Sequence, residues 1–136
     1  MLVARDRDRL DSLAAELTSS HGVRCEVLPA DLADRSDVDR VAARRADDGR
    51  PVTALVNNAG FGLNASFASD DVEDEQRMLD VLVVAVMRLT HAAVPGMVRR
   101  GAGLIFNVHS PAGGNTGGPH AAAKPWGTVF RGGLAE

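Results

Sequence analysis

The sequence predicts an α/β protein, with a parallel sheet flanked by helices. Short apolar segments that suit strands alternate along the chain with segments whose apolar residues recur at every third or fourth position, as in helices. The connections between these segments are short, which suits right-handed crossovers between parallel strands. A length of 136 residues fits one domain, so we treat residues 1–136 as a single, partial domain.

The first elements are predicted as a strand, a helix and a second strand. Residues 2–4 open the chain as a strand, and the helix that follows is capped by Asp6 or Asp8 and stopped by Gly22. Residues 23–28 alternate between apolar and charged side chains, which predicts the second strand. The apolar face of the helix consists of Leu10, Leu13, Ala14 and Leu17.

A second helix is predicted over residues 36–48, and Gly49 ends it. Its inner stripe contains Val38, Val41 and Ala42. Arg45 occupies the next position of that stripe, where an apolar residue would be expected. We therefore expect this helix to pack imperfectly or to let the guanidinium reach outwards.

The second half of the chain continues the alternation. Residues 53–56 are typical of a buried parallel strand and lead into the turn Asn57-Asn58-Ala59-Gly60. Acidic residues at 70–75 suit the positive end of a long helix that runs to about Ala93, and this common role makes a metal site there the weaker interpretation. Residues 104–108 form the next buried strand, and a glycine-rich loop at 113–118 precedes a last helix.

Composition excludes several classes of function. The net charge of -3 and the pI near 5.8 lack the positive footprint of a nucleic-acid binder. Cys25 is the only cysteine, so no intrachain disulfide forms, and a reducing cytoplasm is the expected location. The longest apolar run, residues 81–87, is shorter than the roughly 18 residues that a membrane span needs, and the amino terminus is too charged for a signal peptide.

Three stretches of the sequence carry a resemblance to a known family. They are residues 57–60 (Asn-Asn-Ala-Gly), residues 107–113 (Asn-Val-His-Ser-Pro-Ala-Gly) and residues 120–124 (His-Ala-Ala-Ala-Lys). In that order and spacing the chain resembles the short-chain dehydrogenase/reductase family. The resemblance implies a partial Rossmann-like sheet that binds NAD or NADP at the carboxyl ends of its strands and moves hydride between the nicotinamide and a carbonyl or alcohol.

The resemblance also implies catalytic residues. Ser110 would orient the carbonyl, and Lys124, the only lysine of the chain, would hold the nicotinamide ribose. The chain contains no tyrosine, and His120 stands where the family has its catalytic tyrosine, while Leu82 replaces the asparagine that supports a proton-relay water. An imidazole is shorter than a phenol and, when neutral, donates protons poorly. We therefore expect little or no activity from this chain.

The implied cofactor site lies at the strand ends. Asp31 matches the family's adenine-contacting position, and Arg5 lies where members that prefer NADP place a guanidinium on the 2′-phosphate. A solvated helix start that alternates Arg and Asp explains Arg5 equally well. The glycine-rich turn that receives the pyrophosphate has no counterpart, because the sequence begins at what resembles the family's second strand. The full set of implied residues is Arg5, Asp31, Leu32, Asn57, Ala59, Gly60 and Lys124.

The resemblance also predicts how the sheet is built. In the strand order 3-2-1-4-5-6 the first strand lies between the second and the fourth, so its absence splits the sheet and leaves two open parallel edges. Such edges must close up, be filled by another chain, or be filled by residues upstream of Met1. In the last helix, Pro125 and the glycines at 127, 132 and 133 carry a penalty of roughly 6 kcal/mol if all four lie in its interior. In the alternative, Pro125 falls in the first turn, where proline is tolerated.

Two functions follow from these observations. The first is an oxidoreductase of the short-chain type that acts on a small carbonyl or alcohol through Ser110, Lys124 and His120. The second is a non-catalytic remnant, or a structural module that folds with a partner chain. A second copy of the same chain is one such partner.

Overall fold

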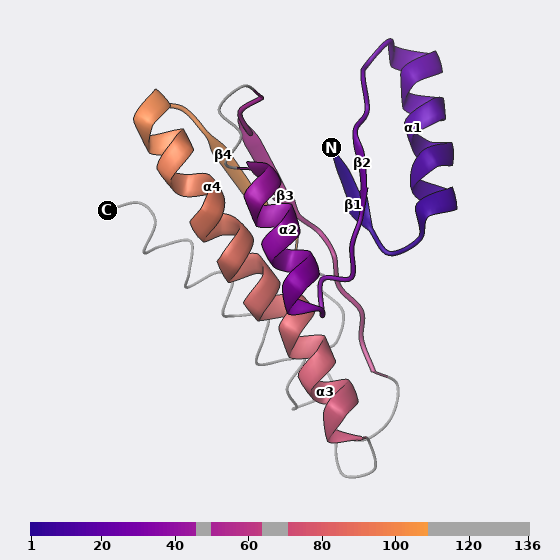
Figure 1. Ribbon diagram of the computed structural model, residues 1–136, viewed down its shortest axis with the longest axis vertical. Helices are drawn as coiled ribbons and strands as arrows, with labels where there is room; N and C mark the ends of the chain where they lie inside the picture. The colour runs from indigo at the N-terminus through magenta and orange to yellow at the C-terminus, as the bar shows by residue number, and fades with distance from the viewer. Residues whose placement is uncertain (46–49, 64–70, 109–136) are drawn as a thin grey trace.

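The computed structural model of the chain describes residues 1–45, 50–63 and 71–108 (Figure 1). Strands and helices alternate along it, which confirms the predicted α/β class. Their order is β1 (Leu2–Ala4), α1 (Arg7–His21), β2 (Val27–Pro29), α2 (Arg35–Arg45), β3 (Ala54–Asn57), α3 (Val72–Leu79), a π-helical segment η1 (Asp80–Ala85), α4 (Val86–Arg100) and β4 (Leu104–Asn107).

The strands of the described residues form two separate two-stranded sheets, which agrees with the predicted split of the sheet. β1 pairs with β2 in parallel, with Leu2 opposite Val27, and β3 pairs with β4 in parallel, with Ala54 opposite Leu104. All the strands point the same way in Figure 1. The carboxyl ends of both sheets therefore lie at the same end of the molecule.

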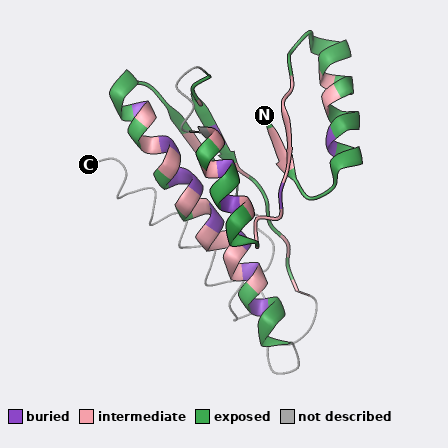
Figure 2. Cartoon of the chain, in the orientation of Figure 1, coloured by how far each residue is buried: buried purple, intermediate pink, exposed green. Residues whose placement is uncertain are grey.

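Helix α1 has the predicted caps but buries less than predicted. The Asp6 carboxylate accepts a hydrogen bond from the Arg9 amide over 3.1 Å, and Gly22, at a φ of 65°, ends the helix. Of the predicted apolar face only Leu10 is buried, whereas Leu13 is 41% exposed. Figure 2 shows most of α1 as exposed. Among the described elements the helix packs mainly on β1 and β2, and a sheet of two short strands covers little of its face.

β2 is shorter than the predicted strand over residues 23–28. It begins at Val27, because β1 offers only three residues for pairing and Leu2 already bonds to the Glu26 carbonyl over 2.8 Å. Val23 lies beyond the end of β1 and is exposed. Alternation of side chains therefore predicted the strand's existence correctly, but its length is set by its neighbour.

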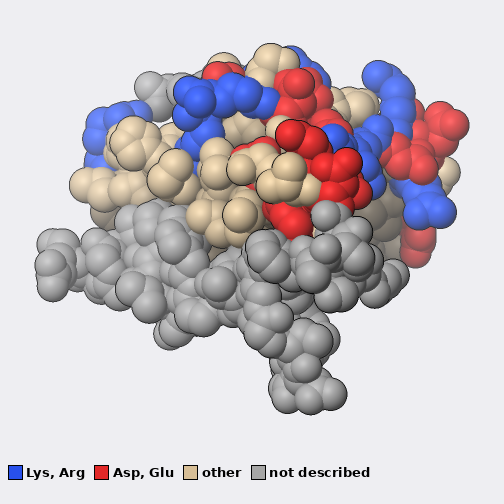
Figure 3. Space-filling model, turned by 90° about the horizontal axis from the view of Figure 1, so that it is seen from below, with Lys and Arg blue, Asp and Glu red and all other residues tan. Residues whose placement is uncertain are grey.

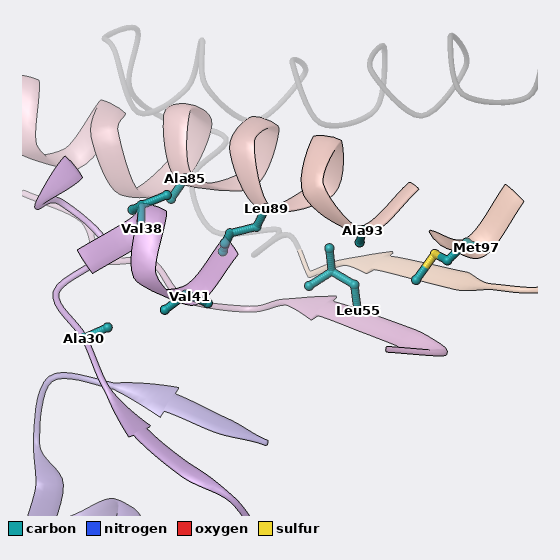
Figure 4. Close-up of a cluster of buried hydrophobic side chains, with 8 residues drawn as sticks. All are labelled: Ala30, Val38, Val41, Leu55, Ala85, Leu89, Ala93 and Met97. Atoms are coloured by element: carbon teal, nitrogen blue, oxygen red, sulfur yellow. The ribbon is translucent and has the colours of Figure 1, made fainter. Parts of the chain in front are cut away.

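The core lies where α2 and α4 cover β3 (Figure 4). α2 begins at Arg35, with the Asp34 carboxylate accepting from the Asp37 amide over 3.0 Å. Val38 and Val41 face inwards as predicted, whereas residues 46–49 and the Arg45 side chain lie outside the described residues. The cluster consists of Ala30, Val38, Val41, Leu55, Ala85, Leu89, Ala93 and Met97.

The acidic segment caps a helix that is longer than predicted. The Asp71 carboxylate accepts from the Glu73 amide over 3.1 Å, and α3, η1 and α4 then run on without a break to Gly101, at a φ of 65°. The predicted end near Ala93 is wrong. Pro95 lies within α4 and is exposed, so water can solvate the carbonyl that its missing N–H leaves free.

By length and composition, residues 72–100 could cross a membrane, since an 18-residue window within these 29 residues has a mean hydropathy of 1.8. Charged residues interrupt this stretch, so its longest uninterrupted apolar run, residues 81–87, gives no indication of a span. Core helices of soluble proteins meet the same criterion. Here Leu89, Ala93 and Met97 belong to the core against α2 and β3.

The predicted burial of β3 and β4 holds for one face only. Leu55 is 2% exposed, whereas Val56, Leu104 and Phe106 are more than half exposed. Successive strand residues point to opposite faces, and α2 and α4 cover the face that contains Leu55. The boundaries also move by one residue, to 54–57 and 104–107. The predicted glycine-rich loop and last helix lie outside the described residues.

Candidate functional site

A groove of about 1030 Å³ brings the predicted cofactor residues together. It is bordered by β1 and β3 and reaches the carboxyl ends of β1, β2 and β3. Arg5 follows β1, Asp31 follows β2 and Gly60 belongs to the turn after β3, so parallel strands deliver them to one end of the sheets. The predicted residues in its lining are Arg5, Asp31, Leu32, Asn57, Ala59 and Gly60. Ser110, His120 and Lys124 lie outside the described residues.

Asp31 is held by its own loop and by a distant arginine. Its amide donates to Asp37 Oδ2 over 2.7 Å, and its Oδ1 accepts from the Ala33 amide over 3.0 Å. Its Oδ2 forms an ion pair with Arg77 of α3. The Arg40 guanidinium and then the Asp31 amide keep the pKa of Asp37 below its ordinary value, so Asp37 stays an acceptor near neutral pH.

Arg77 is a groove residue that the sequence analysis missed. It is separated from Asp31 by 46 residues, and no local pattern connects the two. The spacing of residues along the helix could have indicated that Arg77 faces the groove. Arg77, Val81 and Ala85 recur at four-residue spacing, and all three line the groove.

Arg5 lies between β1 and α1 with its side chain exposed. In the described part of the chain it makes no ion pair, whereas Arg7 and Arg9 pair with Asp11 and Asp6. Its guanidinium is therefore available to an anion at the carboxyl end of the groove.

The turn after β3 is tied to β4 and to the long helix. Asn57 Nδ2 donates to Asn107 Oδ1 over 2.8 Å and lies 3.4 Å from Oγ1 of the buried Thr90. A Cβ on Gly60 would lie 2.8 Å from Leu82 Cδ2, which is closer than real contacts allow. Leu82 thus packs against the turn, and a side chain at position 60 would have to displace the end of Leu82.

An ion cluster lies at the opposite, amino end of the groove. Arg44 makes two hydrogen bonds to Glu26, of 2.7 and 2.6 Å, and Arg50 approaches the same carboxylate within 3.3 Å. The hydrogen bond from Arg44 is the main reason that the pKa of Glu26 lies below its ordinary value. The cluster ties the loop before β2 to α2 and to the segment that enters β3.

Charges of both signs are interleaved at the carboxyl end. Figure 3, which views the molecule from that end, shows basic and acidic side chains side by side over the described residues. In the same described part of the chain no three His, Cys, Asp or Glu side chains are placed to hold a metal ion. The groove therefore offers hydrogen bonds and single charges, which suit an organic ligand with anionic groups.

Comparison with known proteins identifies the family. The family model described as short chain dehydrogenase matches residues 1–127. The chain belongs to the short-chain dehydrogenase/reductase family, as the resemblance of its motifs predicted.

Individual relatives agree with this assignment. A very-long-chain 3-oxoacyl-CoA reductase from Anas platyrhynchos is 33% identical over 117 residues, which cover 82% of this chain and 37% of that protein. Nodulation protein G from Rhizobium meliloti is 36% identical over 124 residues, covering 90% of this chain and 49% of that protein. The chain spans half or less of the length of these two relatives.

Solved structures show the same fold. A short-chain dehydrogenase from Sphingobium yanoikuyae in complex with NADPH superposes with a TM-score of 0.91 at 35% identity, over 98% of this chain and 53% of that one. L-Sorbose reductase from Gluconobacter frateurii, complexed with NADPH and L-sorbose, gives 0.84 at 34% identity, over 98% and 52%. This chain therefore has the architecture of about half of such an enzyme.

Proposed function

We propose that this chain is the cofactor-binding part of an NADP-dependent oxidoreductase of the short-chain type and that its groove binds the adenosine end of the cofactor. The observation that supports this most strongly is that Arg5, Asp31 and the Asn57–Gly60 turn line one groove at the carboxyl ends of parallel strands. Two similar structures are complexes with NADPH. For this chain, the cofactor and the residues that hold it are our proposal.

The residues present fit the adenosine end better than the pyrophosphate. A free guanidinium at Arg5 suits a 2′-phosphate, which it can bind through two parallel hydrogen bonds. Asp31 can accept a hydrogen bond from an amino group of adenine, with Ala33 and Arg77 keeping the carboxylate in place. The residues that line the groove include no glycine-rich turn of the kind that cradles the pyrophosphate in other dinucleotide folds.

Binding of nucleotide fragments tests this proposal directly. Calorimetric titration of the chain with 2′,5′-ADP and with 5′-AMP is expected to show about tenfold tighter binding of the 2′-phosphorylated ligand. Arg5→Gln should remove that difference. Arg9→Gln, at another exposed arginine one turn further along, should preserve it. Failure of millimolar 2′,5′-ADP to bind would refute the proposal.

We further propose that the chain by itself turns over a small carbonyl or alcohol slowly or not at all. Bound NADPH would supply hydride, but the chain has no tyrosine, and His120 stands at the position of the family's proton donor. Ser110 and Lys124 would orient the substrate and the ribose. Oxidation of NADPH in the presence of a small ketone should be near the background rate for the unaltered chain and faster for His120→Tyr. No gain from His120→Tyr would argue against these roles.

The second candidate is a non-catalytic structural module that folds with a partner chain. The split into two two-stranded sheets favours it, because short isolated strand pairs are marginally stable in water. A chain that is monomeric by gel filtration and melts in one cooperative transition would count against this candidate. A melt that becomes cooperative only with an added partner would support it.

A further inference from the structure

The carboxylate of Asp31 is held from two directions. Its Oδ1 accepts a hydrogen bond from the Ala33 amide, over 3.0 Å, within the same loop. Its Oδ2 accepts from the guanidinium of Arg77 on α3, which is 46 residues away in the sequence. The terminal torsion of an aspartate has only weak preferences of its own, so one hydrogen bond leaves the plane of the carboxylate free to turn. The second bond, from Arg77, fixes that plane.

The backbone around Asp31 is fixed by contacts that do not involve Arg77. The Asp31 amide donates to Asp37 Oδ2 over 2.7 Å. Arg40 Nη2 donates to the Pro29 carbonyl over 2.8 Å and to Asp37 Oδ1 over 2.6 Å. These contacts all belong to the connection between β2 and α2 and to the first turns of α2. Loss of the Arg77 side chain should therefore free the Asp31 carboxylate while its backbone stays in place.

The carboxylate of Asp31 keeps acceptor positions that a ligand can use. An ionised carboxylate offers two acceptor sites on each oxygen. Within the described part of the chain each Asp31 oxygen accepts one hydrogen bond, which leaves one site on each. Asp31 and Arg77 both line the groove, and their side chains are 29% and 42% exposed. A ligand in the groove can therefore reach a carboxylate whose orientation is already set.

A carboxylate in a fixed orientation distinguishes two kinds of purine. Adenine has a 6-amino group, which donates a hydrogen bond, whereas hypoxanthine has a 6-oxo group, which only accepts. A fixed carboxylate rewards the donor and leaves the oxo group facing a second acceptor with no proton between them, which is costly. A carboxylate that can turn away gains less from the amino group and loses less with the oxo group. Preference for the 6-amino group therefore depends on how firmly the carboxylate is held.

We propose that Arg77 is a positioning residue that sets the base selectivity of the groove. By fixing the Asp31 carboxylate, it makes the site prefer a 6-aminopurine nucleotide to a 6-oxopurine nucleotide. Arg77 acts through Asp31 and does not itself contact the base. This inference rests on the proposed function, because it concerns the adenosine end of a nucleotide in the same groove.

The ratio of two affinities tests the role of Arg77. Calorimetric titration of the full chain with 5′-AMP and with 5′-IMP is expected to show about tenfold tighter binding of 5′-AMP. Arg77→Gln removes the charge and the planar fork of the guanidinium, and should reduce that preference to about threefold or less. Arg77→Lys keeps the charge but not the fork, so its preference should be intermediate. It also provides the test if Arg77→Gln fails to fold.

A second ion pair between the same parts of the chain provides a matched control. Arg88, further along the same long helix, pairs with Asp39 of α2 across 49 residues. Neither residue lines the groove. Arg88→Gln should therefore leave the preference for 5′-AMP over 5′-IMP unchanged, although it also removes an ion pair between the long helix and the α2 region. A purely structural role of Arg77 would weaken both nucleotides alike and leave their ratio as it is.

A double-mutant cycle shows whether Arg77 acts through Asp31. Asp31→Asn should lower the preference for 5′-AMP by itself, and adding Arg77→Gln should then change the preference no further. If Arg77→Gln lowered the preference equally in the Asp31→Asn background, Arg77 would act on the base directly and the proposal would be wrong.

The outcomes separate this inference from the proposed function. An Arg77→Gln chain that still prefers 5′-AMP about tenfold would overturn the role of Arg77. In that case the proposed function would stand if the preference for the 2′-phosphate continued to depend on Arg5. If the unaltered chain bound neither 5′-AMP nor 2′,5′-ADP at millimolar concentration, both the proposed function and this inference would be refuted.

Discussion

Asn57 and Asn107 join the carboxyl ends of β3 and β4, with Asn57 Nδ2 donating to Asn107 Oδ1 over 2.8 Å. The two residues are also paired in the strand register, so side chains and backbone close the same end of this sheet. Thr90 of α4 lies beside Asn57, and the contact ties the sheet to the helix that covers it. The turn that lines the proposed nucleotide site is thus anchored by an amide pair.

Loss of the amide pair should destabilise the chain. Asn107→Ala removes the acceptor of the half-buried Asn57 amide, and we expect the free energy of unfolding to fall by about 1–2 kcal/mol. Urea denaturation followed by circular dichroism measures this change. Asn58→Ala, at the exposed next position of the turn, should change stability little. Equal effects of the two variants would show that the pair is unimportant.

The Glu26 cluster should make stability depend on pH in the acid range. The hydrogen bond from Arg44, and then the charges of Arg44 and Arg50, lower the pKa of Glu26 below 4.5 in the folded chain. A carboxyl with a lowered folded pKa contributes its full stability above its unfolded pKa and loses it as the pH falls through the folded value.

Glu26→Gln should therefore lower the free energy of unfolding at pH 7 and flatten its decline below about pH 4.5. Denaturant titrations at a series of pH values measure both effects. Glu16→Gln, on the exposed face of α1, is the matched change and should leave the profile as it is. If the free energy of unfolding of Glu26→Gln fell with pH as steeply as that of the unaltered chain, the prediction would be contradicted. The decline that remains in the variant is assigned to other carboxylates with lowered pKa values, such as Asp34 and Asp37.

Position 103 should tolerate no side chain. A Cβ on Gly103 would lie 2.6 Å from the Cβ of the buried Met97, so α4 or the segment entering β4 must shift. We expect Gly103→Ala to lower the free energy of unfolding by about 1–3 kcal/mol.

Gly96→Ala supplies the contrasting measurement. Its Cβ would meet the flexible ends of Arg100, at 3.1 Å, and Arg99, at 3.8 Å, and alanine is favoured over glycine within a helix by about 1 kcal/mol. Thermal melts should therefore move in opposite directions for the two variants. A shift of the same sign in both would be inconsistent with the packing of Gly103 on Met97.

Gly60 and Leu82 should be energetically coupled. Gly60→Ala places a methyl group 2.8 Å from Leu82 Cδ2, so the end of this side chain must shift and some loss of stability is expected. In a Leu82→Ala background the same substitution should cost less. A double-mutant cycle is expected to show a coupling of about 0.5–3 kcal/mol. Additive effects of the two substitutions on stability would mean that Gly60 and Leu82 are not in energetically significant contact.

Much of the local structure was predictable because its signals lie within a few residues of one another. Asp6 and Gly22 bound α1 as predicted, and the acidic run supplied Asp71 as the cap of α3. The turn from Asn57 to Gly60 follows a strand, as the family resemblance implied. The length of the long helix was not predictable in the same way, because Pro95 is tolerated only where its neighbours leave it exposed.

By itself, the sequence determined the alternation of strands and helices, the helix caps and the family, because periodicity and short motifs encode these features locally. Only the tertiary structure decided that Arg77 meets Asp31 across 46 residues and that β2 begins at Val27. It also decided that Val3 and Val56 border one groove. These features depend on which distant surfaces pack together, because strand length, ion pairing and exposure are properties of neighbours in space.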